Sequence, residues 1–223
     1  IGAFMLPHPP IIIPQVGHGE EMKIKKTIEA YLEIAKRIAE LRPDTLIVSS
    51  PHTTIYADYF HISPGERAYG DFKQFGASNL SIEADYDTDF VQTLIDFVDR
   101  QKLPAGTLGE RIKSLDHGTL IPLYFINKFY TNYKLVRIGL SGLSTTEHYR
   151  FGKCIAETAE KLDKRVVFIA SGDLSHKLKE EGPYGYAKEG PAFDRQLTEA
   201  ANRGDFLSLL TFDNDFCERA AEC

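Results

Sequence analysis

Short apolar segments alternate with amphipathic helical segments along this chain, and this alternation constrains its fold more than any other feature. Residues 45–50 and 135–140 are apolar runs of strand length, as are residues 1–6 and 165–170 near the two ends. Over residues 20–41, apolar side chains recur every three or four positions, which predicts one amphipathic helix. We expect further helices over residues 87–100, 117–129, 146–162 and 187–203, and from 213 onward. The alternation predicts an α/β fold with a mostly parallel central sheet flanked by helices on both faces.

The composition excludes several classes of protein. With 223 residues, of which 43% are hydrophobic and 26% charged, the chain suits one compact domain, so we expect a single domain over 1–223. Its apolar runs are far shorter than the roughly 20 residues that span a bilayer, so no membrane association is expected. A net charge of -6 without a basic block argues against nucleic acid as a partner.

The cysteines and the chain ends suggest where the protein works. Three cysteines are an odd number without zinc-finger spacing, and no signal segment precedes the first strand, so we expect a reducing cytoplasm. The chain opens on Ile1 inside an apolar run and stops at Cys223 in a stretch of helical composition. We therefore expect that the native protein has more polypeptide than these 223 residues.

Three histidines follow predicted strands. His8 lies in Pro-His-Pro-Pro, His52 follows Pro51, and His176 ends the segment Ser-Gly-Asp-Leu-Ser-His. Parallel sheets bind ligands at the carboxyl ends of their strands. Prolines stiffen the first two positions, and a stiff ligand position favours a metal because less conformational entropy is lost on binding. His8 and His52 are each equally well explained alone as an ordinary loop residue, but their placement at equivalent points after successive strands predicts a metal site.

The remaining histidines differ in what surrounds them. His117 follows Asp116, which we interpret as a helix N-cap that directs the neighbouring imidazole toward a site. His176 is suited to be a general acid or base, because imidazole titrates near neutral pH. A serine nucleophile is disfavoured, since the Gly-x-Ser-x-Gly turn is missing. We interpret His18, His61 and His148 as structural or surface residues. Of these three, His61 would be the first to reconsider.

Four motifs in this order resemble the class III extradiol ring-cleavage dioxygenases, specifically their LigB-type catalytic subunits. They are Pro-His-Pro-Pro at His8, Ser-Pro-His at His52, Asp-His-Gly-x-x-x-Pro-Leu from Asp116, and Ser-Gly-Asp-Leu-Ser-His ending at His176. Together they span most of the chain. The chain most resembles the branch that includes Memo-type proteins and is associated with radical-SAM proteins.

The resemblance implies a non-haem Fe(II) site and an oxidoreductase activity. His8 and His52 match the two histidine ligands of the family, and Glu222 is the best match to its glutamate ligand, with Glu218 next. His176 matches the acid/base histidine, and His117 matches a second histidine near the substrate. The implied partners are a catechol-type aromatic diol, which would be opened beside its hydroxyl groups, and O2. The resemblance also suggests a homodimer and an additional C-terminal domain beyond Cys223.

Two alternatives stay open. Memo-type relatives suggest a copper- or zinc-binding redox or interaction module without ring cleavage, and Cys217 and Cys223 favour it because thiolates select Cu(I) and Zn over Fe(II). A metal-dependent hydrolase would use the same ligands, although no sequence feature points to it.

Overall fold

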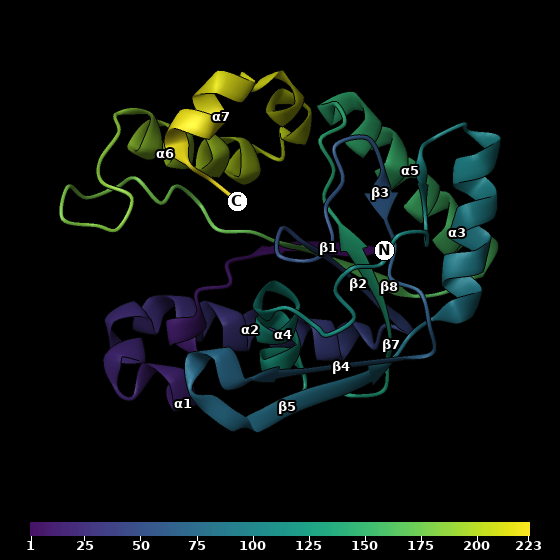
Figure 1. Ribbon diagram of the computed structural model, residues 1–223, viewed down its shortest axis with the longest axis horizontal. Coiled ribbons are helices and arrows are strands. Elements are labelled where there is room, and N and C mark those ends of the chain that lie inside the picture. Colours follow the sequence, from purple (N-terminus) through teal and green to yellow (C-terminus); the bar gives the residue numbers. More distant parts are fainter. The chain divides into compact units, whose positions relative to one another are not determined.

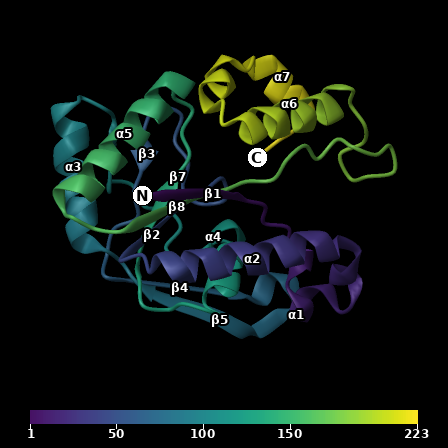
Figure 2. The ribbon, with the colours of Figure 1, turned by 180° about the vertical axis from the view of Figure 1, so that it is seen from behind.

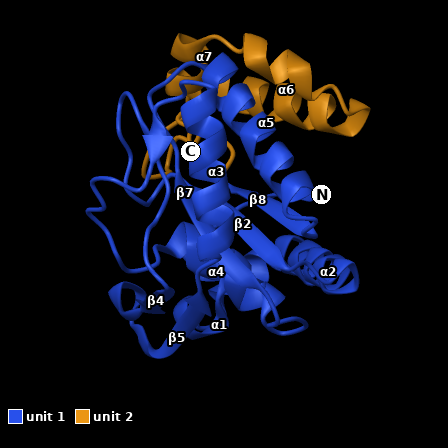
Figure 3. Cartoon of the chain, turned by 90° about the vertical axis from the view of Figure 1, so that its right-hand side faces the viewer, with its two compact units in different colours: residues 1–171 blue, residues 172–223 orange.

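A computed structural model describes all residues from Ile1 to Cys223. The contacts within the chain gather into two compact units, Ile1–Ser171 and Gly172–Cys223 (Figure 3). The single domain over residues 1–223 stays a prediction, and we describe each unit by itself.

The first unit is built on a four-stranded sheet (Figure 1). Its strands are β1 (Gly2–Leu6), β2 (Thr45–Ser50), β7 (Lys134–Gly139) and β8 (Val166–Ser171), in the order β1-β8-β2-β7. All three pairings are parallel, so the four carboxyl ends lie at one edge of the sheet. The prediction of an α/β fold with a mostly parallel sheet is therefore confirmed.

Helices cover both faces of this sheet (Figures 1 and 2). The helices α2 (Lys25–Leu41) and α4 (His117–Ile126) pack with one set of strand side chains, which includes Leu46 and Val48. The helices α3 (Thr88–Arg100) and α5 (Thr145–Lys161) pack with the alternate set, which includes Ile47. Successive strand residues point to opposite faces, so one apolar strand serves two cores.

Most helix boundaries fall close to the predicted ones, with two differences. The amphipathic segment from residue 20 begins as a 3₁₀ helix, η2 (Glu20–Ile24), and becomes α-helical only at Lys25, because Ile24 leaves helical geometry with φ −116° and ψ 33°. Helix α4 ends at Ile126 instead of residue 129. Two short helices, η1 (Pro10–Ile12) and α1 (Pro14–Gly17), follow the proline-rich segment after β1.

Residues 60–106 contain strands that the apolar pattern does not predict. An antiparallel hairpin joins β4 (Arg67–Phe72) and β5 (Ala77–Asp85) through η3 (Lys73–Phe75). Two short strands, β3 (Phe60–His61) and β6 (Ala105–Gly106), pair in parallel. Buried residues alternate with more exposed ones along β4, and most of β5 is exposed or half-buried, so the hairpin lacks the continuous apolar run of the central strands.

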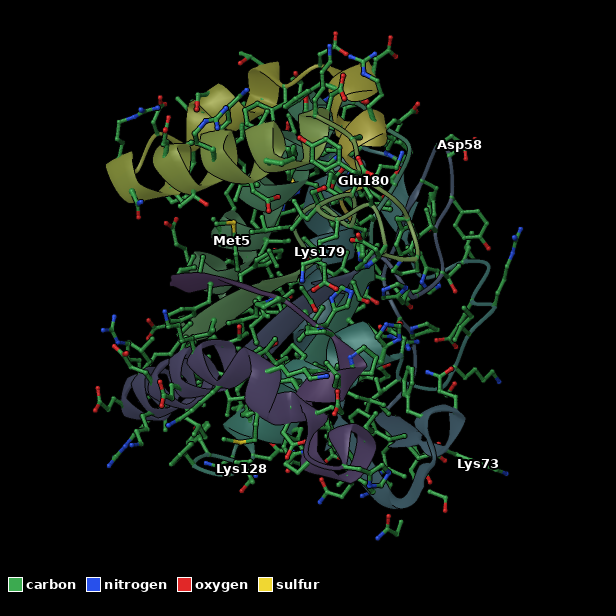
Figure 4. The ribbon with its side chains drawn as sticks, turned by 90° about the vertical axis from the view of Figure 1, so that its left-hand side faces the viewer. Met5, Asp58, Lys73, Lys128, Lys179 and Glu180 are labelled. Carbon is green, nitrogen blue, oxygen red and sulfur yellow. The ribbon has the colours of Figure 1, made fainter.

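The second unit is mainly helical. It contains α6 (Glu189–Arg203), η4 (Phe206–Thr211) and α7 (Asn214–Ala220), held together by three aromatic rings, Phe193, Phe212 and Phe216. A long loop precedes α6, and Lys179 and Glu180 lie exposed on it (Figure 4). None of the helices in the structure has both the length and the apolar character needed to cross a membrane.

Candidate functional site

Two of the predicted ligands meet at the carboxyl edge of the central sheet. His8 follows β1 and His52 follows β2, and the two strands lie on either side of β8. The Nε2 atoms of His8 and His52 lie 2.9 Å apart. His8 is almost completely buried at 1% exposure, whereas His52 is open to solvent in part. The sequence prediction that these two imidazoles share one site is consistent with this distance.

A hydroxyl group on the intervening strand determines which ring nitrogen of His8 carries the proton. Ser171, the last residue of β8, donates its hydroxyl proton to the Gly118 carbonyl at 2.5 Å. The same oxygen lies 3.0 Å from His8 Nδ1 and therefore accepts a proton from that nitrogen. With its proton on Nδ1, a neutral His8 presents the lone pair of Nε2 toward His52. This is the tautomer that a metal ion requires from that nitrogen.

His117 completes a group of three imidazoles. Its ring stacks on His52 with centroids 4.0 Å apart and lies 5.4 Å from the ring of His8. The ligand nitrogens of all three lie within 4.8 Å of one another. The geometry thus brings together both predicted metal ligands and the histidine predicted to stand near the substrate.

The start of helix α4 places His117. Asp116 caps the helix by accepting hydrogen bonds from the backbone N–H and the hydroxyl of Thr119, which agrees with its interpretation as an N-cap. Its Oδ1 also accepts from the Ser50 hydroxyl at 2.5 Å, and the backbone N–H of His52 donates to that hydroxyl oxygen. One carboxylate therefore links the helix that carries His117 to the strand end that carries His52.

The three imidazoles fit a divalent transition metal. Two nitrogen ligands at neighbouring octahedral positions, each about 2.1 Å from an ion, would lie about 3 Å apart, and the His8–His52 nitrogens are separated by 2.9 Å. Neutral imidazoles suit iron, copper and zinc alike. The donor set is therefore that of a metal site without selecting a particular metal.

A pocket of about 820 Å³ opens beside these histidines. His52 and His117 line it, together with Ile112, Ser114, Leu115 and Asp116 from the segment before α4, and Tyr69, Asp71 and Gln74 from the β4–β5 hairpin. Lys73 also lines the pocket from the hairpin tip, as Figure 4 shows near the periphery. The volume is within the range of sites that enclose small organic molecules.

His176 has its own set of contacts within the second unit. Its Nδ1 lies 2.7 Å from the carbonyl oxygen of Ala221, and its backbone N–H donates to the same oxygen. Because a carbonyl only accepts, Nδ1 carries a proton and Nε2 is the nitrogen that gains and loses one. Nε2 lies 3.8 Å from the Asp173 carboxylate. This arrangement is appropriate for an acid/base residue.

The predicted glutamate ligands lie in the same unit. Glu222 directly follows Ala221, whose backbone is left-handed with φ 51°, and Glu218 is exposed on α7. The tail is held against the segment of His176, because the Cys223 N–H donates to the Asp173 carbonyl. That Glu222 is a metal ligand remains a prediction. That Cys217 and Cys223 favour copper or zinc over iron also remains a prediction.

The sequence reasoning missed several residues that organise the site. The sequence places Ser50 and Ser171 in motifs, where a serine nucleophile is disfavoured, and Arg137 within an apolar strand, and it predicts no role in the site for any of the three. All three lie at or near the ends of the central strands, which is the signal that could have identified them. His61, interpreted as structural, is wholly buried, and neither ring nitrogen has a hydrogen-bond partner.

His61 therefore has an unusual protonation equilibrium. Burial, together with the positive charge of Arg137, lowers the pKa of His61 to about 4. The imidazole is neutral at physiological pH, and it is separate from the histidine group at the sheet edge. Its structural interpretation is consistent with this burial.

Comparison with known proteins gives matches along the whole chain. Residues 2–223 match the model of the family described as the catalytic LigB subunit of aromatic ring-opening dioxygenase. A Clostridium acetobutylicum relative called Protein CA_C1420 is 40% identical over 229 residues, which cover 100% of this chain and 49% of the relative. The chain thus spans about half the length of that relative.

Two further relatives carry names that state an activity. The 3,4-dihydroxyphenylacetate 2,3-dioxygenase of Escherichia coli is 26% identical over 210 residues, covering 85% of this chain and 74% of the relative. The 2-aminophenol 1,6-dioxygenase beta subunit of a Pseudomonas species is 24% identical over 253 residues, covering 99% of this chain and 80% of the relative. The match of the family model from the first strand to the last residue shows that this chain belongs to the LigB family of aromatic ring-opening dioxygenases.

Proposed function

We propose that this chain is a non-haem Fe(II)-dependent dioxygenase that opens the ring of a catechol-type aromatic diol with O2. The observation that supports it most is the His8–His52 pair, with Nε2 atoms 2.9 Å apart and the His8 tautomer set by Ser171. The family match and two relatives named as dioxygenases add to it. Iron, when bound, supplies a path for electrons between the diol and O2.

His8 and His52 would hold the metal through their Nε2 atoms. The third ligand has two candidates, Glu222, which the resemblance implies, and His117, whose nitrogen lies within 4.8 Å of the other two. A carboxylate would complete the two-histidine, one-carboxylate set that is typical of non-haem iron oxygenases. Three histidines would leave Glu222 without a ligand role and would suit zinc or copper as well.

The other residues would bind the substrate and move its protons. The pocket beside His52 and His117 would take the aromatic ring, with His117 close to its hydroxyl groups. His176 would accept a phenolic proton at Nε2 and return it later, since Nδ1 is held by the Ala221 carbonyl. The fixed orientation of the His176 ring favours this transfer.

Metal content and oxygen uptake test the proposal directly. We expect anaerobically reconstituted protein to bind one Fe(II) and to consume O2 with at least one compound from a panel that includes 3,4-dihydroxyphenylacetate and 2-aminophenol. His52→Ala should lose the metal, whereas His176→Ala should keep the metal and lose turnover. Stoichiometric iron without O2 uptake across the panel would refute ring cleavage.

A second pair of variants identifies the third ligand. We expect Glu222→Gln to weaken Fe(II) binding by a larger factor than His117→Gln if the resemblance assigns the ligand correctly. The opposite order would assign the third position to His117. Metal selectivity measured on the same variants with Zn(II) and Cu(I) tests the Memo-like alternative, in which copper or zinc binds without turnover.

A further inference from the structure

Arg137 is a fully buried charge within an otherwise apolar strand. Its neighbours in β7 are Leu135, Val136 and Ile138, and the guanidinium itself has 0% exposure. Burying a guanidinium costs several kcal/mol unless its donors are satisfied. The identity of its acceptors therefore indicates what the residue does.

Most of these acceptors belong to one short segment, residues 110–116. Nη1 donates to the Ser114 carbonyl at 2.7 Å, and Nη2 donates to the Ile112 carbonyl at 2.6 Å and to the Glu110 carboxylate at 3.3 Å. The Asp116 carboxylate lies 4.0 Å from Nη1. Only Nε donates elsewhere, to Ser63 at 2.7 Å.

The segment held in this way reaches His52 and His117, the two partly exposed histidines of the site. Its side chains line the pocket, and it ends at Asp116, the residue before His117. Asp116 in turn accepts from Ser50, whose oxygen receives the backbone N–H of His52. A continuous series of contacts thus runs from the guanidinium to the residues that place both rings.

We propose that Arg137 is a positioning residue for this site, holding residues 110–116 so that the pocket wall and the ring of His117 keep their places. The effect of Arg137 on metal binding rests on the proposed function, whereas its contacts with residues 110–116 do not depend on it. A planar guanidinium spans two carbonyls and a carboxylate at once, which the point charge of a lysine does not. Arg137→Lys should therefore keep the positive charge but lose the simultaneous hydrogen bonds to the two carbonyls and the carboxylate.

Amide hydrogen exchange and Co(II) binding test this role. In Arg137→Lys we expect amides of residues 111–120 to exchange at least about tenfold faster, and Co(II), read from its visible absorption, to bind about 10- to 100-fold more weakly. The matched control is Lys164→Met, which removes another partly buried ion pair, that with Asp87 at 2.7 Å. The control should keep the wild-type Co(II) affinity, and its exchange in residues 111–120 should not rise by more than that of amides in the rest of the chain.

A folded Arg137→Lys protein with wild-type exchange in residues 111–120 and wild-type Co(II) affinity would overturn the proposal. If Arg137→Lys does not fold, Glu110→Gln carries the test, because it removes the negative charge of one partner of the guanidinium at a partly solvated position. Faster exchange confined to residues 111–120 supports the role in that variant, and unchanged exchange refutes it. The exchange measurement is made without metal, so a wild-type chain that binds no Co(II) refutes the proposed function and leaves this test intact.

Discussion

The hydroxyl of Ser171 contacts both His8 and helix α4, because Ser171 is the last residue of β8. It lies between the strands that lead to His8 and His52, it accepts from His8 and it donates to the first turn of α4. Its single proton is committed to the Gly118 carbonyl, so the ring of His8 is left with one tautomer. An alanine at this position would remove both contacts without changing the fold of the strand.

Ser171→Ala is expected to weaken Co(II) binding by about 10- to 100-fold, because a ligand imidazole without its outer partner loses orientation and basicity. Isothermal titration with the metal measures this change. The control is Ser49→Ala on β2, where the hydroxyl donates only to the Ile169 carbonyl at 3.4 Å. Equal affinities for Ser171→Ala and wild type would contradict the assigned role of the hydroxyl.

His61 provides a pH dependence of stability. Its folded-state pKa of about 4 lies below the unfolded value of about 6.5, so below pH 6.5 the unfolded chain binds the additional proton. The free energy of unfolding should therefore fall as the pH is lowered from 6.5 toward 4, by roughly 3 kcal/mol from this residue.

Urea denaturation across that pH range, compared between wild type and His61→Phe, isolates the contribution of His61. The variant should have a flatter pH dependence, since it has no imidazole to protonate. His18→Asn is the control, as His18 is exposed and its left-handed backbone tolerates asparagine. Parallel curves for wild type and His61→Phe would show that His61 does not titrate in this way.

At the scale of elements, helix α4 approaches the end of β2 closely, and a glycine makes this possible. A Cβ on Gly118 would collide with the Ser50 hydroxyl and come within 3.0 Å of the Asp116 carboxylate. Gly152, in the middle of α5, has no heavy atom within 4 Å of the same position. Two helical glycines thus differ in whether a methyl group has space.

Gly118→Ala is expected to destabilise the protein by about 1–3 kcal/mol, as overpacking does. Gly152→Ala should instead stabilise it by up to about 1 kcal/mol, because alanine is the better helix former. Chemical denaturation of both variants measures whether the free energy of unfolding falls or rises in each. A stabilising Gly118→Ala would mean that α4 and the end of β2 separate at little cost.

At the scale of the whole first unit, the two edges of the parallel sheet at which the strands begin and end carry different polar groups. The carboxyl edge carries the histidines, whereas Asp87 pairs with Lys164 and accepts from Thr45, the first residue of β2. The backbone N–H of Asp87 donates to Leu135 near the start of β7. This ion pair therefore belongs to the amino edge, and we expect it to contribute to stability without affecting the histidine site.

Lys164→Met should lower the free energy of unfolding by about 2 kcal/mol, since Asp87 loses a charged donor. Its Fe(II) stoichiometry and O2 uptake should match those of wild type below the melting temperature. Thermal unfolding and metal analysis on one preparation check both statements. Loss of metal in this variant would show that the two edges of the sheet are coupled.

The sequence by itself determined the α/β class, because continuous apolar strands and amphipathic helices differ in period and each must bury its apolar side chains. It also located His8, His52 and His117 in motifs, and identified Asp116 as a cap, since these signals are local. Whether His176 and Glu222 act as predicted depends on their placement relative to the first unit.

The tertiary structure decided how the local signals combine. The strand order β1-β8-β2-β7 places Ser171 between two histidine-bearing strand ends that lie 44 residues apart in sequence. The same packing buries Arg137 against the segment before His117, and it forms the β4–β5 hairpin that lines the pocket. Such contacts join residues 23 to 163 positions apart, and local periodicity contains no information about pairs at that separation.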